Sequence, residues 1–182
     1  MVAESQLISA REYAMWPEQR APIELIGGEV VVSPGPTPDH EMILSDLKDV
    51  LRSVAEARQL GRWFQAPLDL FISGYDVLQP DLMLFAPDQL PGRKELPVEK
   101  IPLIVLEVLS PGTRRTDLRE KLPKYASRGI GEYWVVDPTN KSVTINLLND
   151  FGAYQPHIVG SLPINVGLYE GIRLPLADIF AE

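Results

Sequence analysis

Apolar residues recur at helical spacing in residues 40–58, and this pattern predicts an amphipathic helix. The apolar positions form a single stripe and are Ile43, Leu44, Leu47, Val50, Leu51 and Val54. Asp39 directly precedes the stretch and is the expected N-cap, because its short side chain can accept a hydrogen bond from a free N–H group of the first turn. One face of this helix is therefore expected to pack against the core.

A second long helix is predicted over residues 117–128, with Thr116 as its cap. Gly129 is suited to end this helix, since glycine readily adopts the left-handed conformation that follows many helices. Pro123 lies inside the stretch and predicts either a kink or a helix that begins later. A further short helix is expected over residues 5–14.

Short apolar runs bounded by Gly, Pro, Asn and Asp predict strands. These runs cover residues 23–32, 61–72, 82–85, 101–109, 132–136, 142–148 and 153–159. The Gly27-Gly28 pair turns the first run into a hairpin, and the last two runs are expected to pair as another. Pro67 breaks the second run, and residues 73–77 and 87–99 are expected to be loops.

The order of these elements predicts an α/β fold, with a central mixed β-sheet flanked by helices and additional β-hairpins. Residues 101–109 are almost continuously apolar, as expected of a strand that is covered on both faces. No repeat, low-complexity segment or linker divides the sequence, so residues 1–182 are expected to form a single domain.

The composition is that of a globular chain, with 45% hydrophobic and 23% charged residues. No apolar run approaches the roughly 20 residues of a membrane helix, and the N-terminus lacks the basic and apolar regions of a signal peptide. The absence of cysteine rules out disulfides and thiolate metal sites. We therefore expect a cytoplasmic protein without a membrane partner.

The net charge of −8 argues against a general nucleic-acid coat protein, which carries a basic footprint. Basic residues are nevertheless concentrated in one part of the chain, namely Arg114, Arg115, Arg119, Lys121, Lys124 and Arg128. They can face a phosphate backbone or form the solvated side of a helix, and the sequence leaves both interpretations open.

Asp81, Glu107 and Lys121 are charged residues at positions where a strand or helix with a purely structural role would rarely need a charge. Glu107 interrupts the apolar run L-I-V-L-E-V-L, where an unpaired carboxylate would be costly. Either a structural salt bridge or a bound cation removes that cost, and Asp81 after Pro80 can also be a turn residue. Brought together, two carboxylates and a lysine are the groups that a divalent cation and a phosphodiester require.

Lys121 shares one predicted helix face with Asp117 and Tyr125, because the spacing is i, i+4, i+8. An ordinary Asp-Lys helix pair is one interpretation of this spacing. The other is a lysine that orients a water molecule or stabilises the charge of a phosphate at a metal site.

His40 is the histidine nearest to these elements, and it can carry a proton near neutral pH or simply form a local hydrogen bond. Glu24 and Glu29 lie on the first hairpin, and strand alternation decides which of the two faces the site. The motifs of serine hydrolases, P-loop proteins and dinucleotide-binding proteins are absent from the sequence.

The sequence resembles the Uma2 family within the PD-(D/E)XK restriction-endonuclease-like superfamily. The matching segments are I-E-L-I-G-G-E-V-V-V-S-P at 23–34 with His40 downstream, Q-P-D at 79–81, E-V-L-S-P at 107–111, D-L-R-E-K-L at 117–122, G-I-G-E-Y-W-V-V-D-P at 129–138 and G-I-R-L-P-L-A-D-I-F at 171–180. They span nearly the whole chain. Their combination is specific to the family, although each motif alone is weak.

The resemblance implies a central mixed sheet flanked by helices and a metal site formed by Asp81 and Glu107. Mg²⁺ or Mn²⁺ is the implied cofactor. The superfamily lysine usually stands two residues after the second acid, where this chain has Leu109. Lys121, on the following helix, is the expected substitute.

We therefore expect a metal-dependent DNA endonuclease that hydrolyses phosphodiester bonds with metal-activated water. Asp81 and Glu107 would hold the metal, Lys121 would position water or phosphate, and His40 and Tyr125 would support the site from its rim. Cleavage of both strands of a duplex would call for a symmetric homodimer. Two alternatives remain: an inactive nuclease fold that binds nucleic acid or protein, and a hydrolase of a small phosphate ester.

Overall fold

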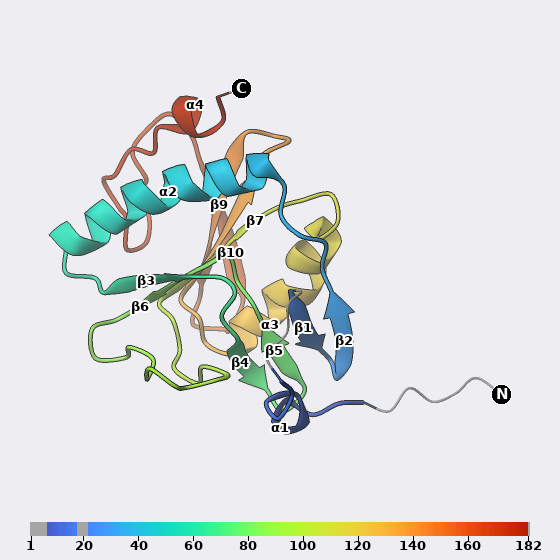
Figure 1. Cartoon of the computed structure of the whole chain (residues 1–182). Helices are drawn as coiled ribbons and strands as arrows, with labels where there is room; N and C mark the ends of the chain where they lie inside the picture. The colour runs from blue at the N-terminus through green and yellow to red at the C-terminus, as the bar shows by residue number, and fades with distance from the viewer. Residues whose placement is uncertain (1–6, 18–21, 182) are drawn as a thin grey trace.

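The computed structural model describes residues 7–17 and 22–181, which form two β-sheets and the helices around them (Figure 1). The strands are β1 (Ile23–Ile26), β2 (Glu29–Val32), β3 (Arg62–Gln65), β4 (Leu70–Ser73), β5 (Asp76–Leu78), β6 (Leu82–Phe85), β7 (Ile104–Val108), β8 (Glu132–Asp137), β9 (Ser142–Leu148) and β10 (Tyr154–Val159). The helices are α1 (Ala10–Tyr13), α2 (Pro38–Ala57), the π-helical segment η1 (Thr116–Lys121), α3 (Leu122–Ser127) and α4 (Leu176–Ile179).

The larger sheet has the strand order β10-β9-β8-β7-β6-β3 and is mixed, because β7 and β8 are parallel and the other neighbours antiparallel. All five residues of β7 are buried, which explains the continuous apolar run in the sequence. The smaller sheet has the order β2-β1-β5-β4 and contains the expected first hairpin. These sheets and their flanking helices confirm the α/β fold.

Successive residues of the large sheet face two different cores. Leu82, Leu84 and Leu106 pack on the α2 side, together with the apolar stripe of that helix. Met83 and Val105 pack on the opposite side with residues of α3 and the smaller sheet. Figure 1 shows the same layers, with α2 along one side of the large sheet and α3 and the smaller sheet on the other.

Helix α2 begins earlier than predicted, and its cap is Thr37 rather than Asp39. The Thr37 hydroxyl accepts a hydrogen bond from the His40 N–H at 3.3 Å. Pro38 occupies the first helical position, where its missing N–H is not needed and its fixed φ suits a helix. This start places His40 in the first turn.

The second predicted helix also begins earlier, so Thr116 is not its cap. Arg114 and Arg115 are already helical, and the Ser110 hydroxyl accepts a hydrogen bond from the Thr113 N–H at 3.2 Å. The expected disturbance near Pro123 takes the form of η1, a wide π-helical stretch that leads into the first turn of α3. A proline there has no N–H to donate, and the wider turn accommodates that loss.

Three smaller predictions have mixed outcomes. Residues 73–77 are not a loop throughout, because Ser73 ends β4 and β5 begins at Asp76. Helix α1 is capped by Ser9 and covers only part of the predicted range 5–14, whose first two residues lie outside the described part of the chain. Gly129 has a φ of +81° and follows α3 as expected.

None of the helices in the described part of the chain has the length and apolar character needed to span a membrane.

Asp76 joins three parts of the smaller layer. Its carboxylate accepts hydrogen bonds from Lys124 Nζ at 2.5 Å, from Ser73 Oγ at 2.6 Å and from the Gly27 N–H at 2.7 Å. Burial raises the pKa of Asp76, but the bonds from Lys124, Ser73 and Gly27 together lower it below its usual 3.8. These bonds therefore stabilise the fold only while Asp76 is ionised.

We expect Asp76→Asn to lower the free energy of unfolding at neutral pH by about 1–3 kcal/mol. The difference from the wild type should shrink as the pH falls below 3.8 and through the lower pKa of folded Asp76, because the wild-type carboxylate then becomes protonated and neutral, like the amide. Urea unfolding at neutral pH and in acid measures both values. An equal difference at both pH values would contradict the assigned role of the ionised carboxylate.

Candidate active site

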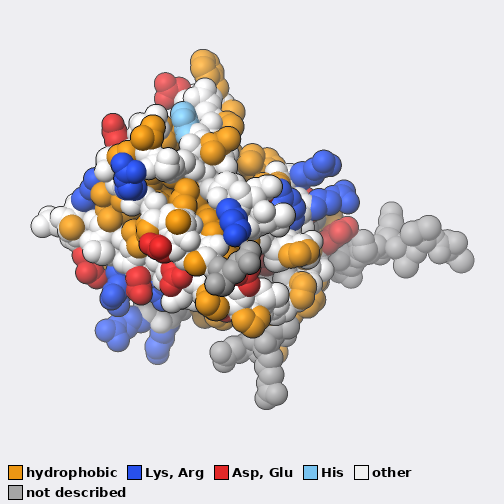
Figure 2. All heavy atoms as spheres, turned by 90° about the horizontal axis from the view of Figure 1, so that it is seen from above, with side chains coloured by type: hydrophobic (Ala, Val, Ile, Leu, Met, Phe, Trp, Pro, Cys, Tyr) orange, Lys and Arg blue, Asp and Glu red, His pale blue; other side chains and the backbone are white. Residues whose placement is uncertain are grey.

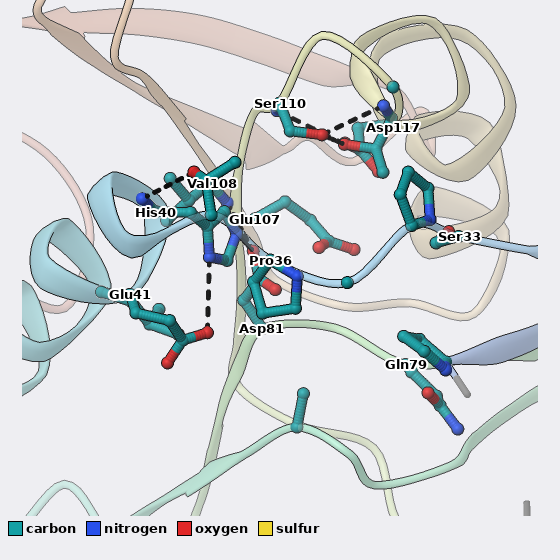
Figure 3. Close-up of a pocket in the computed structure, with 18 of the residues that line it drawn as sticks. Ser33, Pro36, His40, Glu41, Gln79, Asp81, Glu107, Val108, Ser110 and Asp117 are labelled. Carbon is teal, nitrogen blue, oxygen red and sulfur yellow. Dashed lines mark hydrogen bonds and ion pairs between the residues drawn. The ribbon is translucent and has the colours of Figure 1, made fainter. Parts of the chain in front are cut away.

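One cavity of about 390 Å³ lies where the start of α2, the start of β6, the end of β7 and η1 meet (Figure 3). Five of the six predicted site residues line it, and these are Glu24, His40, Asp81, Glu107 and Lys121. Tyr125 was expected at the rim and is instead fully buried behind Glu107. The fold thus brings together residues that lie far apart in the sequence.

Asp81 directly precedes β6, and the antiparallel pairing of Leu82 with Leu106 places it beside Glu107. Its Oδ2 accepts a hydrogen bond from the Val108 N–H at 2.7 Å and lies 3.2 Å from His40 Nε2. The bond with Asp81 raises the pKa of His40, although burial opposes this effect. This contact holds the His40 ring beside Asp81.

Glu107 points from β7 toward the helical segment η1–α3. Its Oε1 accepts hydrogen bonds from Lys121 Nζ at 3.0 Å and from the Tyr125 hydroxyl at 2.7 Å. Burial raises the pKa of Glu107 well above 4.5, with Lys121 acting against this effect and the acids around it adding to it. The carboxylate therefore depends on nearby positive charge to remain ionised.

Lys121 is held by three carboxylates at once. Its Nζ lies 2.9 Å from Glu24 Oε1, 3.0 Å from Glu107 Oε1 and 3.2 Å from Asp117 Oδ1. Burial lowers the pKa of Lys121, but Glu107, Glu24 and Asp117 raise it further, so the ammonium stays charged. Lys121 thus lies beside the second acid, although it comes from the helical segment and not from the strand.

Leu109 stands where the superfamily usually has its lysine, and its side chain belongs to the core. It is 5% exposed and packs with Val105 and Tyr125. It is not part of the cavity wall. The departure from the usual motif therefore leaves the arrangement of Asp81 and Glu107 intact.

The structure resolves the choice between the two hairpin acids and adds two groups that the sequence did not assign to the site. Glu24 is buried in the cavity wall, whereas Glu29 is exposed. The Gln79 N–H donates a hydrogen bond to Glu24 Oε1 at 2.8 Å. Asp117 does not form an ordinary surface Asp-Lys pair, since it is 1% exposed and is the third carboxylate in contact with Lys121. Its i, i+4 spacing was the available sequence signal.

The concentrated basic residues do not form a continuous groove. Arg114 pairs with Asp137 at 2.9 Å, Lys124 is bound to Asp76, and Arg128 donates a hydrogen bond to the Glu99 carbonyl. Arg115 and Arg119 are exposed. Figure 2 shows Lys and Arg side chains in separate groups, with acidic and apolar side chains between them.

The chemistry of the acid pair suits a hard divalent cation. The described residues contain no group of three or more His, Cys, Asp or Glu side chains placed to bind a metal ion. Mg²⁺ is commonly held by one or two carboxylates together with water and phosphate. Asp81 and Glu107 both line the cavity, and three of its carboxylates share one lysine: Glu24, Glu107 and Asp117 all contact Lys121. This excess of negative charge is what a bound cation would offset.

The fold and this acid–lysine cluster define an α/β protein of nuclease-like architecture. A solved structure described as a "putative nuclease belonging to DUF820" from Anabaena variabilis ATCC 29413 has the same fold, with a TM-score of 0.77 and 22% identity over 96% of this chain and 98% of that chain. The chain belongs to the Uma2 family, described as "Putative restriction endonuclease", which matches residues 10–177. No curated protein matches the chain.

Tyr125→Phe should weaken the site without disrupting the core. The substitution removes the hydroxyl that donates to Glu107 Oε1 at 2.7 Å and keeps the ring that packs 5.0 Å from that of Tyr133. We expect the free energy of unfolding to fall by about 1–2 kcal/mol, because a buried carboxylate loses one donor. Urea unfolding measures the effect, and Tyr154→Phe, which removes a hydroxyl that donates to the Ile130 carbonyl, is the matched control. A fall in the control variant as large as that in Tyr125→Phe would show that the loss does not depend on the Glu107 carboxylate.

Proposed function

We propose that this protein is a metal-dependent nuclease that hydrolyses phosphodiester bonds in DNA. The observation that carries the proposal is the meeting of Asp81, Glu107 and Lys121 in one cavity, with Lys121 Nζ 3.0 Å from Glu107 Oε1. Membership of the Uma2 family supports the same class of reaction. The lysine comes from a helix rather than from the strand, yet it reaches the second acid.

Asp81 and Glu107 are the residues that would hold the cation. Hydrogen bonds from the described residues reach Oδ2 of Asp81 and Oε1 of Glu107, which leaves the second oxygen of each carboxylate as a candidate ligand. When bound there, Mg²⁺ or Mn²⁺ would lower the pKa of a water molecule and offset the charge of the phosphate.

The side chains around the acid pair have separate tasks in hydrolysis. A bond forms between the oxygen of water and phosphorus, the P–O bond to one sugar breaks, water loses a proton and the sugar oxygen gains one. Lys121 orients the water or the phosphate from the side of Glu107. His40, which borders the cavity beside Asp81, is the group that can exchange a proton there near neutral pH.

Metal titration followed by DNA cleavage tests this function. We expect calorimetry to detect binding of Mg²⁺ or Mn²⁺ to the wild type, and cleavage of plasmid or oligonucleotide DNA to require the metal and to stop with a chelator. Absence of metal binding, even with DNA present, would overturn the proposal. The cytoplasmic location and the homodimer remain predictions. Cell fractionation tests the location, and light scattering tests the oligomeric state.

A hydrolase of a small phosphate ester is the second candidate, and the cavity wall favours it. The volume of about 390 Å³ lies at the lower end of small-molecule sites. Among the described residues of the wall, Lys121 is the one Lys or Arg side chain, and it is buried. Hydrolysis of a chromogenic phosphate monoester without cleavage of any nucleic acid would favour this candidate.

A further inference from the structure

Two loops that contain proline border the mouth of the cavity. Residues 33–37 connect β2 to α2, and residues 110–113 connect β7 to the helical segment before η1. The loops meet, since a Cβ atom placed on Gly112 would lie 3.1 Å from Pro34 Cγ. Figure 3 shows the first loop, with Ser33 and Pro36, running past the acidic residues of the cavity. The entrance is therefore narrowed on the side of these loops.

The acids lie at the bottom of this cavity rather than on an open surface. The side chain of Asp81 is 19% exposed and that of Glu107 is 4% exposed. A scissile phosphate must enter the cavity to reach them. In a regular duplex the phosphates lie on the outside of a wide, stiff double helix, which cannot itself enter a narrow cavity. A strand therefore has to separate from its partner before its phosphate can reach these acids.

The charges of the wall also differ from those of a duplex-binding surface. Proteins that track a duplex neutralise several phosphates with Lys and Arg. The described wall has Lys121 alone among such residues, and Glu41 adds an acid near the entrance. Apolar groups fill much of the remaining wall, including Pro34, Pro36 and Pro67, and they offer contact surfaces for a sugar or an unstacked base.

We infer that the site takes one unpaired strand, such as a single-stranded segment, a flap or a loop, and excludes a continuous duplex. This inference rests on the proposed nuclease function and specifies its substrate. Pro34, Pro36 and Gly112 are the residues that set the selectivity, through the contact between the two loops. A single strand needs one site, so a second copy of the chain is not required for its cleavage.

Three DNA substrates of one sequence test the inference: a single strand, a fully paired duplex and a duplex with an unpaired central loop. With Mg²⁺ or Mn²⁺ present, kcat/KM for the single strand and the loop should exceed that for the duplex by at least about tenfold. Equal or faster cleavage of the paired duplex would overturn the inference. Asp81→Asn distinguishes a failure of the proposed nuclease function from a failure of the substrate assignment. If the substitution leaves the cleavage of all three substrates unchanged, the proposed function fails. If cleavage depends on Asp81 but prefers the duplex, only the assignment to an unpaired strand is overturned.

Pro34→Gly tests the role of the mouth directly. Removal of the ring beside Gly112 should raise duplex cleavage several-fold relative to single-strand cleavage, so the ratio of the two moves toward one. Retained single-strand cleavage also shows that the variant is folded. Pro156→Ala, at an exposed position of β10 outside this cavity wall, is the matched control and should keep the wild-type ratio. An unchanged ratio in Pro34→Gly would overturn the assignment of selectivity to this contact.

Discussion

Asp81→Asn should lower kcat/KM for phosphodiester hydrolysis by about 10³-fold or more, the scale expected when a group that stabilises transition-state charge is removed. The amide keeps the size of the side chain and can still accept the hydrogen bond that the Val108 N–H donates at 2.7 Å. It removes the negative charge that would bind a cation at the cavity. We therefore expect the activity to be lost while the fold persists.

Calorimetry and kinetics on the same variant check this result. Binding of Mn²⁺ to Asp81→Asn should fall below detection, and the unfolding midpoint should stay near that of the wild type. Asp88→Asn is the matched control, because Asp88 is an exposed aspartate on the loop after β6. Wild-type metal binding in Asp81→Asn would mean that Asp81 is not a ligand, and equal loss in both variants would mean that the effect is general.

The sequence was most informative where one residue departed from a strong local pattern. Glu107 stood out because the rest of its run is apolar, and the structure buries all five residues of β7. Asp81 could be paired with it because two short strands that follow each other along the chain tend to be neighbours in a sheet. Local hydrophobic pattern and chain order therefore predicted the acid pair.

What the sequence could not predict depends on contacts between distant segments. Glu24 and Glu29 lie on one hairpin, and only the packing of the smaller sheet decides that Glu24 faces the cavity. The three carboxylates around Lys121 come from a strand of each sheet and from η1. At Pro123 the sequence predicted a kink or a later helix start, whereas the structure has a π-helical turn in a helix that begins earlier, because helical spacing does not reveal how a proline is accommodated.

Lys121→Met should produce the largest loss of stability, about 3–5 kcal/mol at neutral pH, because it leaves buried carboxylates without their cation. In the wild type, Lys121 Nζ lies within 3.2 Å of Glu24, Glu107 and Asp117. Methionine has a similar length and fills the same space without a charge. The expected loss is therefore electrostatic rather than a loss of packing.

The pH dependence of this loss of stability shows whether its cause is electrostatic or a loss of packing. The pKa values of Glu107 and Asp117 are already raised by burial, and Lys121 acts against that effect in both. Without Lys121 these pKa values rise further, so the variant gains stability as the carboxyl groups take up protons and loses it as the pH rises through their folded-state values. The difference in the free energy of unfolding between variant and wild type should therefore be smallest at a pH below 3.8, the lower of the usual pKa values of these two carboxyl groups, and widen as the pH rises above 4.5.

Urea unfolding in the presence of a chelator measures this gap for the metal-free protein at each pH. Lys100→Met, at an exposed position, should change the free energy of unfolding by less than about 0.5 kcal/mol. Adding Glu107→Gln to Lys121→Met should recover part of the loss, because one of the uncompensated charges is removed. A gap that does not change with pH, or a double variant no more stable than the single one, would mean that Lys121 stabilises the fold by packing. Lys121 would then lose the electrostatic role that links it to the acid pair.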